Sequence, residues 1–315
     1  STSLNETHFS TTMEKITTWN FEILALAEAV DGFPMMYIGY CIFRYFDWFN
    51  KFNIREDTLR SFLLNVESGY RKENSYHNNT HAADVTQTLF YFLTTGGMIE
   101  QHKFTSLEIF SAIISAMLHD IDHPGRNNAF LVNTANPLAL LYNDESVLEN
   151  HHCATGFAQI TREESNILKG LPKEEYIQVR KQVISLILGT DFAKHFSILA
   201  NFKDLMCSED VDMESRENRT LVLKVALKCA DISHTTKAQH LHLAWTDRVS
   251  EEFFCQGDDE KKHGLSISPG MNREEVNVCK SQVGFLNFLA LPLYQEFARS
   301  NPGCEVSLKG VQRNL

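Results

Sequence analysis

Apolar residues recur at helical spacing along almost the whole chain, and this pattern limits the fold more than any other feature. In the stretch 106–118 they are spaced mostly by three and four, which places them on one helix face: Leu107, Ile109, Phe110, Ile113, Ile114, Met117 and Leu118. Similar spacing recurs in 21–30, 37–50, 82–97, 146–160, 176–188, 191–206, 221–232, 239–255 and 276–299. No stretch shows the sustained alternation and turn signals of a hairpin. The sequence therefore predicts an all-α fold of about a dozen or more helices.

The breaks between these stretches are short, which favours one compact multi-helix domain over the whole of 1–315. The chain has 315 residues, 43% of them hydrophobic and 22% charged, which allows a sizeable core. A Ser/Thr-rich start at 1–12 is expected to be loosely ordered. The longest polar interval, 256–275, is predicted to be a loop, either a lid over a site or a mobile surface loop.

Net charge and cysteine usage restrict the partners and the compartment. The formal net charge is -11, whereas nonspecific nucleic-acid binding relies on clustered Lys and Arg, so no nucleic-acid partner is expected. No apolar run approaches the ~18 residues of a membrane span, and no signal peptide precedes the first helical stretch. Seven dispersed cysteines without a CxxC pair favour reduced thiols in a cytoplasmic protein. Because the chain starts at Ser1 rather than Met, we expect a domain excised from a longer protein, with a possible regulatory domain elsewhere.

Histidine and acidic residues gather in four short segments that flank helical stretches. They read His77-Asn78-Asn79-Thr80-His81, His119-Asp120-Ile121-Asp122-His123, Glu149-Asn150-His151-His152 and Ala230-Asp231. Imidazole and carboxylate ligands suit Zn²⁺ paired with Mg²⁺ or Mn²⁺. The four segments together therefore predict one two-metal hydrolytic centre, assembled by the fold.

Some of these segments, taken alone, have a less specific explanation. His77 and His81 are four apart, so on a helical turn they would share one face, but such pairs also arise by coincidence on polar surfaces. The helix end at His119-Asp120 is expected to be buried, and its charges then need partners. A structural salt-bridge cluster would need Lys or Arg, and only Arg126 is close in sequence. A metal explains the excess of acceptors better, and Asp231 at the end of another apolar stretch follows the same logic.

The segments, together with further motifs, resemble the class I cyclic nucleotide phosphodiesterases. The resemblance spans roughly 70–300 in unbroken order and is nearest the cAMP-hydrolysing branch. Its motifs are Tyr76-His77-Asn78-Asn79-Thr80-His81-Ala82-Ala83-Asp84-Val85, His119-Asp120-Ile121-Asp122-His123-Pro124-Gly125, Tyr142-Asn143-Asp144-Glu145-Ser146-Val147-Leu148-Glu149-Asn150-His151-His152, Ala230-Asp231-Ile232-Ser233, Trp245-Thr246-Asp247-Arg248, Glu251-Glu252-Phe253-Phe254 and Lys280-Ser281-Gln282-Val283-Gly284-Phe285.

The resemblance implies a role for each residue of the centre, which would lie in a deep pocket. Zn²⁺ would be held by four ligands, namely His81, His119, Asp120 and Asp231. Asp120 would also bridge to a second ion, Mg²⁺ or Mn²⁺, and a hydroxide between the two ions would attack phosphorus. His77 would be the general acid that protonates the leaving oxygen. His123 would lie beside the phosphate, and Glu149 would orient metal-bound water or the acid histidine.

The resemblance also implies a nucleotide pocket. Gln282 and Phe285 are three apart, hence on one helix face, and would read the base edge and stack on the purine. Val249 would form the other side of this clamp, and Tyr76 is expected at the substrate. Two residues depart from the cAMP-preferring pattern: His234 stands where Asn is usual, and Phe192 where Met is usual. The change at His234 weakens the case for a strict adenine preference.

The most specific function that these patterns predict is hydrolysis of 3',5'-cyclic nucleotides, cAMP and also cGMP, to 5'-nucleoside monophosphates. An HD-type nucleotidase acting on nucleoside monophosphates is the alternative, and it would have no reason to carry Gln282 and Phe285 at this place. A non-catalytic cyclic nucleotide sensor should have lost His77 or a metal ligand, and the chain retains them all.

Overall fold

The computed structural model describes residues 5–208 and 211–315, and every regular element in these ranges is helical, so the all-α prediction is confirmed. The α-helices are α1 (Glu6–Lys15), α2 (Ile23–Ala29), α3 (Pro34–Tyr45), α4 (Trp48–Lys51), α5 (Glu56–Ser68), α6 (Asn79–Leu93), α7 (Met98–His102), α8 (Ser106–Leu118), α9 (Asn128–Asn133), α10 (Pro137–Leu141), α11 (Val147–Ile160), α12 (Lys173–Ile187), α13 (His195–Cys207), α14 (Arg216–Asp231), α15 (Gln239–Lys262), α16 (Val278–Phe285), α17 (Leu291–Ser300) and α18 (Glu305–Asn314). Shorter 3-10 turns are η1 (Glu163–Ser165), η2 (Phe192–Lys194), η3 (Ser233–Thr236) and η5 (Pro302–Cys304), and η4 (Leu286–Ala290) is a π-helix.

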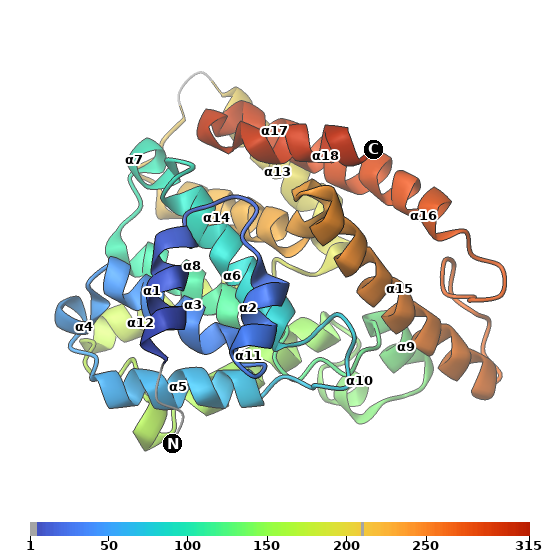
Figure 1. Cartoon of the computed structure of the whole chain (residues 1–315), viewed down its shortest axis with the longest axis horizontal. Helices are drawn as coiled ribbons and strands as arrows, with labels where there is room; N and C mark the ends of the chain where they lie inside the picture. Colours follow the sequence, from blue (N-terminus) through green and yellow to red (C-terminus); the bar gives the residue numbers. More distant parts are fainter. Residues whose placement is uncertain (1–4, 209–210) are drawn as a thin grey trace.

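Helix α8 lies among the other helices and packs against α6, α12 and α14 (Figure 1). Thr105 caps its first turn in a capping box with Glu108. Arg219 of α14 donates to the buried Glu108 carboxylate at 2.9 Å, so an ion pair joins the two helices. From Glu108 to Leu118 every residue of α8 is buried, which carries the polar residues that follow it into the interior.

The start of α6 and the end of α14 meet the end of α8. Helix α6 begins at Asn79 because the Asn78 side chain accepts hydrogen bonds from the backbone N–H groups of Thr80 and His81, at 3.0 and 3.2 Å. His81 therefore lies in the first turn of α6, while Asp231 is the last residue of α14. These helix ends place three of the predicted ligand segments side by side.

The prediction of a loop over 256–275 is wrong for residues 256–262, because α15 continues to Lys262. Gln256 donates to Glu260 at 3.0 Å within the helix, and both side chains are buried. Gly257 allows the connecting segment to approach closely, since a Cβ there would lie 2.0 Å from the carbonyl oxygen of Met271. Ser268 in turn donates to Glu260 at 2.6 Å. The polar residues are thus paired with one another, and the connection between α15 and α16 covers only 263–277.

Of two further expectations about the elements, one needs correction and one is confirmed. The loosely ordered start predicted for 1–12 is helical from Glu6, because Asn5 caps α1 and the Phe9 ring packs edge-on against Tyr40 at 5.5 Å; residues 1–4 lie outside the described part. The helical stretch predicted for 276–299 is confirmed, because α16, the π-helix η4 and α17 follow one another without a break over 278–300. Pro292 at the start of α17 has no N–H to donate, so the regular α ladder cannot run through it.

In the described ranges, no single helix combines the length and hydropathy that crossing a membrane would need. One pair of helical segments, Lys173–Ile187 and Phe192–Cys207, reaches these values only when taken together, and it is bent by 84°.

Candidate metal centre

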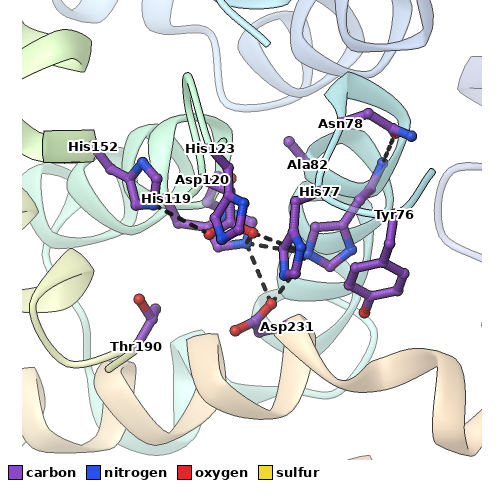
Figure 2. Close-up of polar contacts among 12 residues, drawn as sticks. Tyr76, His77, Asn78, Ala82, His119, Asp120, His123, His152, Thr190 and Asp231 are labelled. Atoms are coloured by element: carbon purple, nitrogen blue, oxygen red, sulfur yellow. Dashed lines mark hydrogen bonds and ion pairs between the residues drawn. The ribbon is translucent and has the colours of Figure 1, made fainter. Parts of the chain in front are cut away.

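Four predicted ligands converge from three helices. His81 comes from α6. His119 and Asp120 come from the end of α8, and Asp231 comes from the end of α14; Figure 2 labels these three residues. The two histidines are buried, whereas the side chains of Asp120 and Asp231 remain 13% and 17% exposed. The carboxylates can therefore be reached from outside, while the imidazoles form the inner wall.

The spacing of these ligand atoms matches a tetrahedral ion. His119 Nε2 lies 3.1 Å from Asp120 Oδ2 and 3.3 Å from both Asp231 Oδ1 and His81 Nε2. His81 Nε2 lies 3.2 Å from Asp231 Oδ1 and 3.4 Å from Asp120 Oδ2. A tetrahedron with the usual zinc bonds of about 2.0–2.1 Å has edges of about 3.3 Å. Five of the six distances between the four ligand atoms therefore match the edges of such a tetrahedron, and the sixth, between Asp120 and Asp231, is within 4.8 Å.

Hydrogen bonding and charge prepare these groups for a cation. The Nδ1 atom of His119 donates to the carbonyl oxygen of Ala116 at 2.8 Å, which orients its Nε2 toward the other ligands. Burial disfavours the charged ring, but the Asp120 carboxylate outweighs burial and raises the pKa of His119 well above its usual range, so a bound cation would replace the proton on Nε2. Burial alone would raise the pKa values of Asp120 and Asp231, but the neighbouring His119 outweighs it and keeps both pKa values below the usual range. Both carboxylates are therefore held in the ionised form that binds metal.

A cluster of salt bridges does not explain the centre. In the described part of the chain, Asp120 and Asp231 have ion-pair contacts only with histidines. Arg126, the one cation close in sequence, instead donates to Asp259 at 3.1 Å. Asp122 does follow the salt-bridge explanation, because Arg71 and His151 contact its carboxylate at 2.7 and 2.8 Å.

A second group of ligands adjoins the first. Asp120, His123 and His152 present ligand atoms that all lie within 4.8 Å of one another. His152 Nδ1 donates to the carbonyl oxygen of Ile121 at 2.7 Å, and its Nε2 lies 3.7 Å from Asp120 Oδ1. Burial lowers the pKa of His152 to about 4, so the ring is neutral. Asp120 therefore faces the first ligand set with one oxygen and His152 with the other, and a second cation could lie on this side.

His77 lies beside the ligands but on no helix, so the expected shared helix face with His81 is wrong. It precedes the cap Asn78, and Glu252 of α15 holds it in place instead. One oxygen of Glu252 accepts the backbone N–H groups of Tyr76 and His77, each at 3.0 Å. The other oxygen faces the Nδ1 atom of His77 at hydrogen-bonding distance. Glu252 is a functional candidate that the sequence argument left without a role, although the motif Glu251-Glu252-Phe253-Phe254 contains it.

This pairing controls the protonation of His77. Burial disfavours the charged ring, but the Glu252 carboxylate outweighs burial and raises the pKa of His77 to about 9. The pKa of Glu252 falls to about 2, because His77 outweighs the effect of burial there. The His123 ring stacks on the His77 ring, with 4.0 Å between the ring centroids. Burial, together with the charge of His77, keeps the pKa of His123 well below its usual range. At neutral pH His77 is thus protonated, whereas the His123 ring stacked on it is neutral.

A model of the 3'5'-cyclic nucleotide phosphodiesterase family matches residues 76–311 of the chain. The chain belongs to this family. It is 38% identical over 292 residues to 3',5'-cyclic-AMP phosphodiesterase 4C of Mus musculus and to that of Rattus norvegicus, covering 91% of this chain and 42% and 54% of those proteins. It is 37% identical over 299 residues to 3',5'-cyclic-AMP phosphodiesterase, isoform F, of Drosophila melanogaster, covering 93% of this chain and 45% of that protein. The chain spans about half the length of these relatives.

Glu149 pairs with Asn128 rather than with His77. Its carboxylate accepts hydrogen bonds from Asn128 Nδ2 at 3.0 and 3.4 Å, and the described residues show no bond between it and His77. Burial first, and then the charge of Asp191, raises the pKa of Glu149 to about 7. His77 is paired with Glu252 instead, so the described residues give no contact for one of the two roles expected for Glu149, that of orienting His77.

One of the predicted pocket residues, Tyr76, contacts a ligand of the centre, and a second, His234, contacts Tyr76. The centroid of the Tyr76 ring lies 4.5 Å from that of the His81 ring and 5.9 Å from that of the His234 ring (Figure 2 labels Tyr76). His234 is buried in η3 and stacks on His242 at 5.5 Å, and its Nδ1 atom has no hydrogen-bond partner in the described part. Burial, followed by the charge of His242, lowers the pKa of His234 to about 3, so its ring is neutral.

The remaining predicted pocket residues lie on other elements. Val249 of α15 and Phe285 of α16 are partly buried and pack against the main core. Gln282, also on α16, has a buried Oε1 atom without a partner among the described residues. Phe192 in η2 is 52% exposed, and its ring stacks on His195 at 6.3 Å. None of these four makes a hydrogen bond or ring contact with the metal ligands in the described ranges.

Proposed function

We propose that this chain hydrolyses 3',5'-cyclic nucleotides, cAMP and also cGMP, to 5'-nucleoside monophosphates. The observation that carries the proposal is the tetrahedral ligand set beside a protonated histidine, within a chain that belongs to the cyclic nucleotide phosphodiesterase family. A ligand set by itself would suit many hydrolases. A histidine that stays protonated next to such a ligand set suits a reaction in which a leaving oxygen needs a proton.

Zn²⁺ would be held by His81, His119, Asp120 and Asp231, and Mg²⁺ or Mn²⁺ would lie beyond Asp120, on the side of His123 and His152. When bound, divalent ions supply Lewis acidity, which acidifies water and neutralises phosphate charge. His123 would lie beside the phosphate, and Glu149 would orient water there. The first group offers four ligand atoms, as four-coordinate Zn²⁺ requires, whereas the second offers three and would leave its ion room for water.

His77 would donate the proton that the leaving O3' oxygen needs. Its Nδ1 faces Glu252, so the proton to be donated is the one on Nε2. The Glu252 carboxylate stabilises the charged ring before the reaction and fixes its orientation. Since Glu252 also accepts two backbone N–H groups from the same segment, the acid is held rigidly at the place where it acts.

The purine would be bound between Phe285 and Val249, with Gln282 at its edge, His234 nearby, Tyr76 at the substrate and Phe192 in the wall. Unpaired buried atoms on Gln282 and His234 support this, because a buried polar atom without a partner costs about 1–3 kcal/mol and a base could satisfy it. An amide and a neutral imidazole can each present a donor or an acceptor. We therefore expect discrimination between adenine and guanine of no more than about 1–3 kcal/mol.

Initial rates of cAMP, cGMP and AMP hydrolysis by the isolated chain, with and without a chelator, test this function. Both cyclic nucleotides should be hydrolysed, AMP should not, and the chelator should abolish the activity. Release of phosphate from AMP without cleavage of cyclic nucleotides would instead support a nucleotidase.

Base choice is tested by His234→Asn, which should shift the kcat/KM ratio toward cAMP. A native chain with more than roughly a thousandfold preference for cAMP would exceed the expected discrimination and contradict dual specificity.

The predicted cytoplasmic location stays a prediction. All seven cysteines are free thiols, which agrees with a reducing compartment.

A further inference from the structure

The 3-10 turn η3 connects the metal centre to the nucleotide pocket. It follows Asp231 by two residues, and it carries His234. All four of its residues are buried, and so is Lys237 directly after it. Ser233 also contacts Thr88 of α6, with 3.2 Å between their hydroxyl oxygens. A small displacement of this turn would therefore move the His234 ring relative to the metal ligands.

The segment before α2 holds η3 from one side. The ammonium group of Lys237 donates to the carbonyl oxygen of Trp19 at 2.7 Å and lies 4.3 Å from the centroid of the Trp19 ring. Trp19 Nε1 donates to the carbonyl oxygen of Thr236 at 3.4 Å. The side chain of Asn20 accepts the backbone N–H of Ala238 at 2.8 Å. These contacts join residues more than two hundred positions apart in the chain.

The last helix, α18, holds η3 from its other end. Asn314 Nδ2 donates to the carbonyl oxygens of Thr235 and Lys237, each at 2.9 Å. Arg313 adds a donor at 3.2 Å to the same Lys237 oxygen. Gly310 permits the close approach, because a Cβ there would lie 1.9 Å from the carbonyl oxygen of Thr236.

Side chains from the two ends of the chain thus satisfy backbone groups that a regular helix would satisfy internally. Because a 3-10 turn this short has few hydrogen bonds of its own, its shape depends on these outside donors and acceptors. His234 adds the observation that points to a ligand: it is 6% exposed and its Nδ1 atom has no partner in the described residues.

We propose that the segment Trp19–Asn20 and helix α18 determine base selectivity by holding η3 and thereby fixing the position of His234. Asn314 and Asn20 are the positioning residues, since Asn314 contacts Thr235 within the turn and Asn20 contacts Ala238, two residues after it. The inference rests on the proposed function, in which His234 lies at the base. It adds that selectivity is set by residues at both ends of the chain, far in sequence from the pocket.

Asn314→Asp tests the α18 side, because an Asp side chain has nearly the same shape but cannot donate to the two carbonyl oxygens. Gln312→Glu is the matched control: it introduces the same charge at an exposed position on the same helix. The readout is the ratio of kcat/KM for cAMP to that for cGMP. Partial unfolding lowers both values equally and leaves this ratio unchanged, so a merely structural role would not move it.

Asn20→Ala tests the other side, with Asn20→Asp as the conservative variant that keeps an acceptor for the Ala238 N–H. We expect Asn314→Asp and Asn20→Ala each to move the ratio toward one by about threefold or more, while Gln312→Glu and Asn20→Asp leave it unchanged. Zinc content should stay at the native level in all four.

The inference is overturned if Asn314→Asp and Asn20→Ala hydrolyse both nucleotides with the native ratio of kcat/KM values, or with a ratio further from one. A native chain that hydrolyses neither nucleotide would instead refute the proposed function, so the two failures are distinguishable.

Discussion

At the scale of single residues, burial lowers the pKa of His77 and the Glu252 carboxylate raises it, and the carboxylate outweighs burial. If His77 is the general acid, kcat/KM must fall as pH rises through its pKa of about 9, because only the protonated ring can donate. Glu252→Gln removes the charge but leaves the burial. The alkaline limb of the pH profile should then move to lower pH by about 1–3 pH units.

The matched control for this variant is Glu251→Gln, the exposed neighbour whose carboxylate pairs with Arg273. Its pH profile should coincide with that of the native chain. An unchanged alkaline limb in Glu252→Gln would show that another group sets it.

His77→Ala tests the same residue through the leaving group of the substrate. Because His77 is outside the tetrahedral ligand set, the variant should keep its metals while kcat falls by about 10²–10⁴, the usual contribution of a positioned acid. A substrate with a better leaving group needs less protonation and should regain much of that rate. Equal losses on both substrates would exclude His77 as the acid.

At the scale of elements, the start of α6 positions both His77 and His81, and one side chain determines it. Asn78→Ala should lower the free energy of unfolding in urea by about 1 kcal/mol, because two N–H groups lose their acceptor. Asn78→Asp keeps a capping oxygen, although both variants lose the Nδ2 contacts to Asn74 and Ser75. The comparison therefore isolates the cap, and equal stability of the two variants would contradict this assignment.

At the scale of the whole molecule, a bound cation would join three helices that begin or end at the centre. Metal that binds only the folded chain stabilises it by about 4 kcal/mol at a free concentration of a thousand times Kd. A chelator should therefore lower the denaturant midpoint of the native chain. Asp231→Ala should lose activity and zinc, and its midpoint should not respond to the chelator. Asp204→Ala, an exposed substitution on α13, should respond like the native chain. A full equivalent of zinc in Asp231→Ala would refute the ligand assignment.

Local patterns in the sequence determined much of the secondary structure and the choice of ligands. The stretch 106–118 coincides with α8, because its apolar spacing and its capping residues act within a few positions. The residues His81, His119, Asp120 and Asp231 could be selected because acidic and imidazole groups at the ends of apolar helices need a common partner. The family could be recognised because long motifs occur in unbroken order.

Only the tertiary structure decided which distant groups meet. Glu252 is 175 residues from His77, and no local pattern pairs them, although their contact sets the charge of the proposed acid. The helical course of 256–262 depends on packing against Met271, which outweighs a composition typical of loops. The position of η3 likewise depends on Trp19 and Asn314, which lie near opposite ends of the chain. Periodicity and capping act between near neighbours, whereas these pairings arise only when the packed helices bring remote segments together.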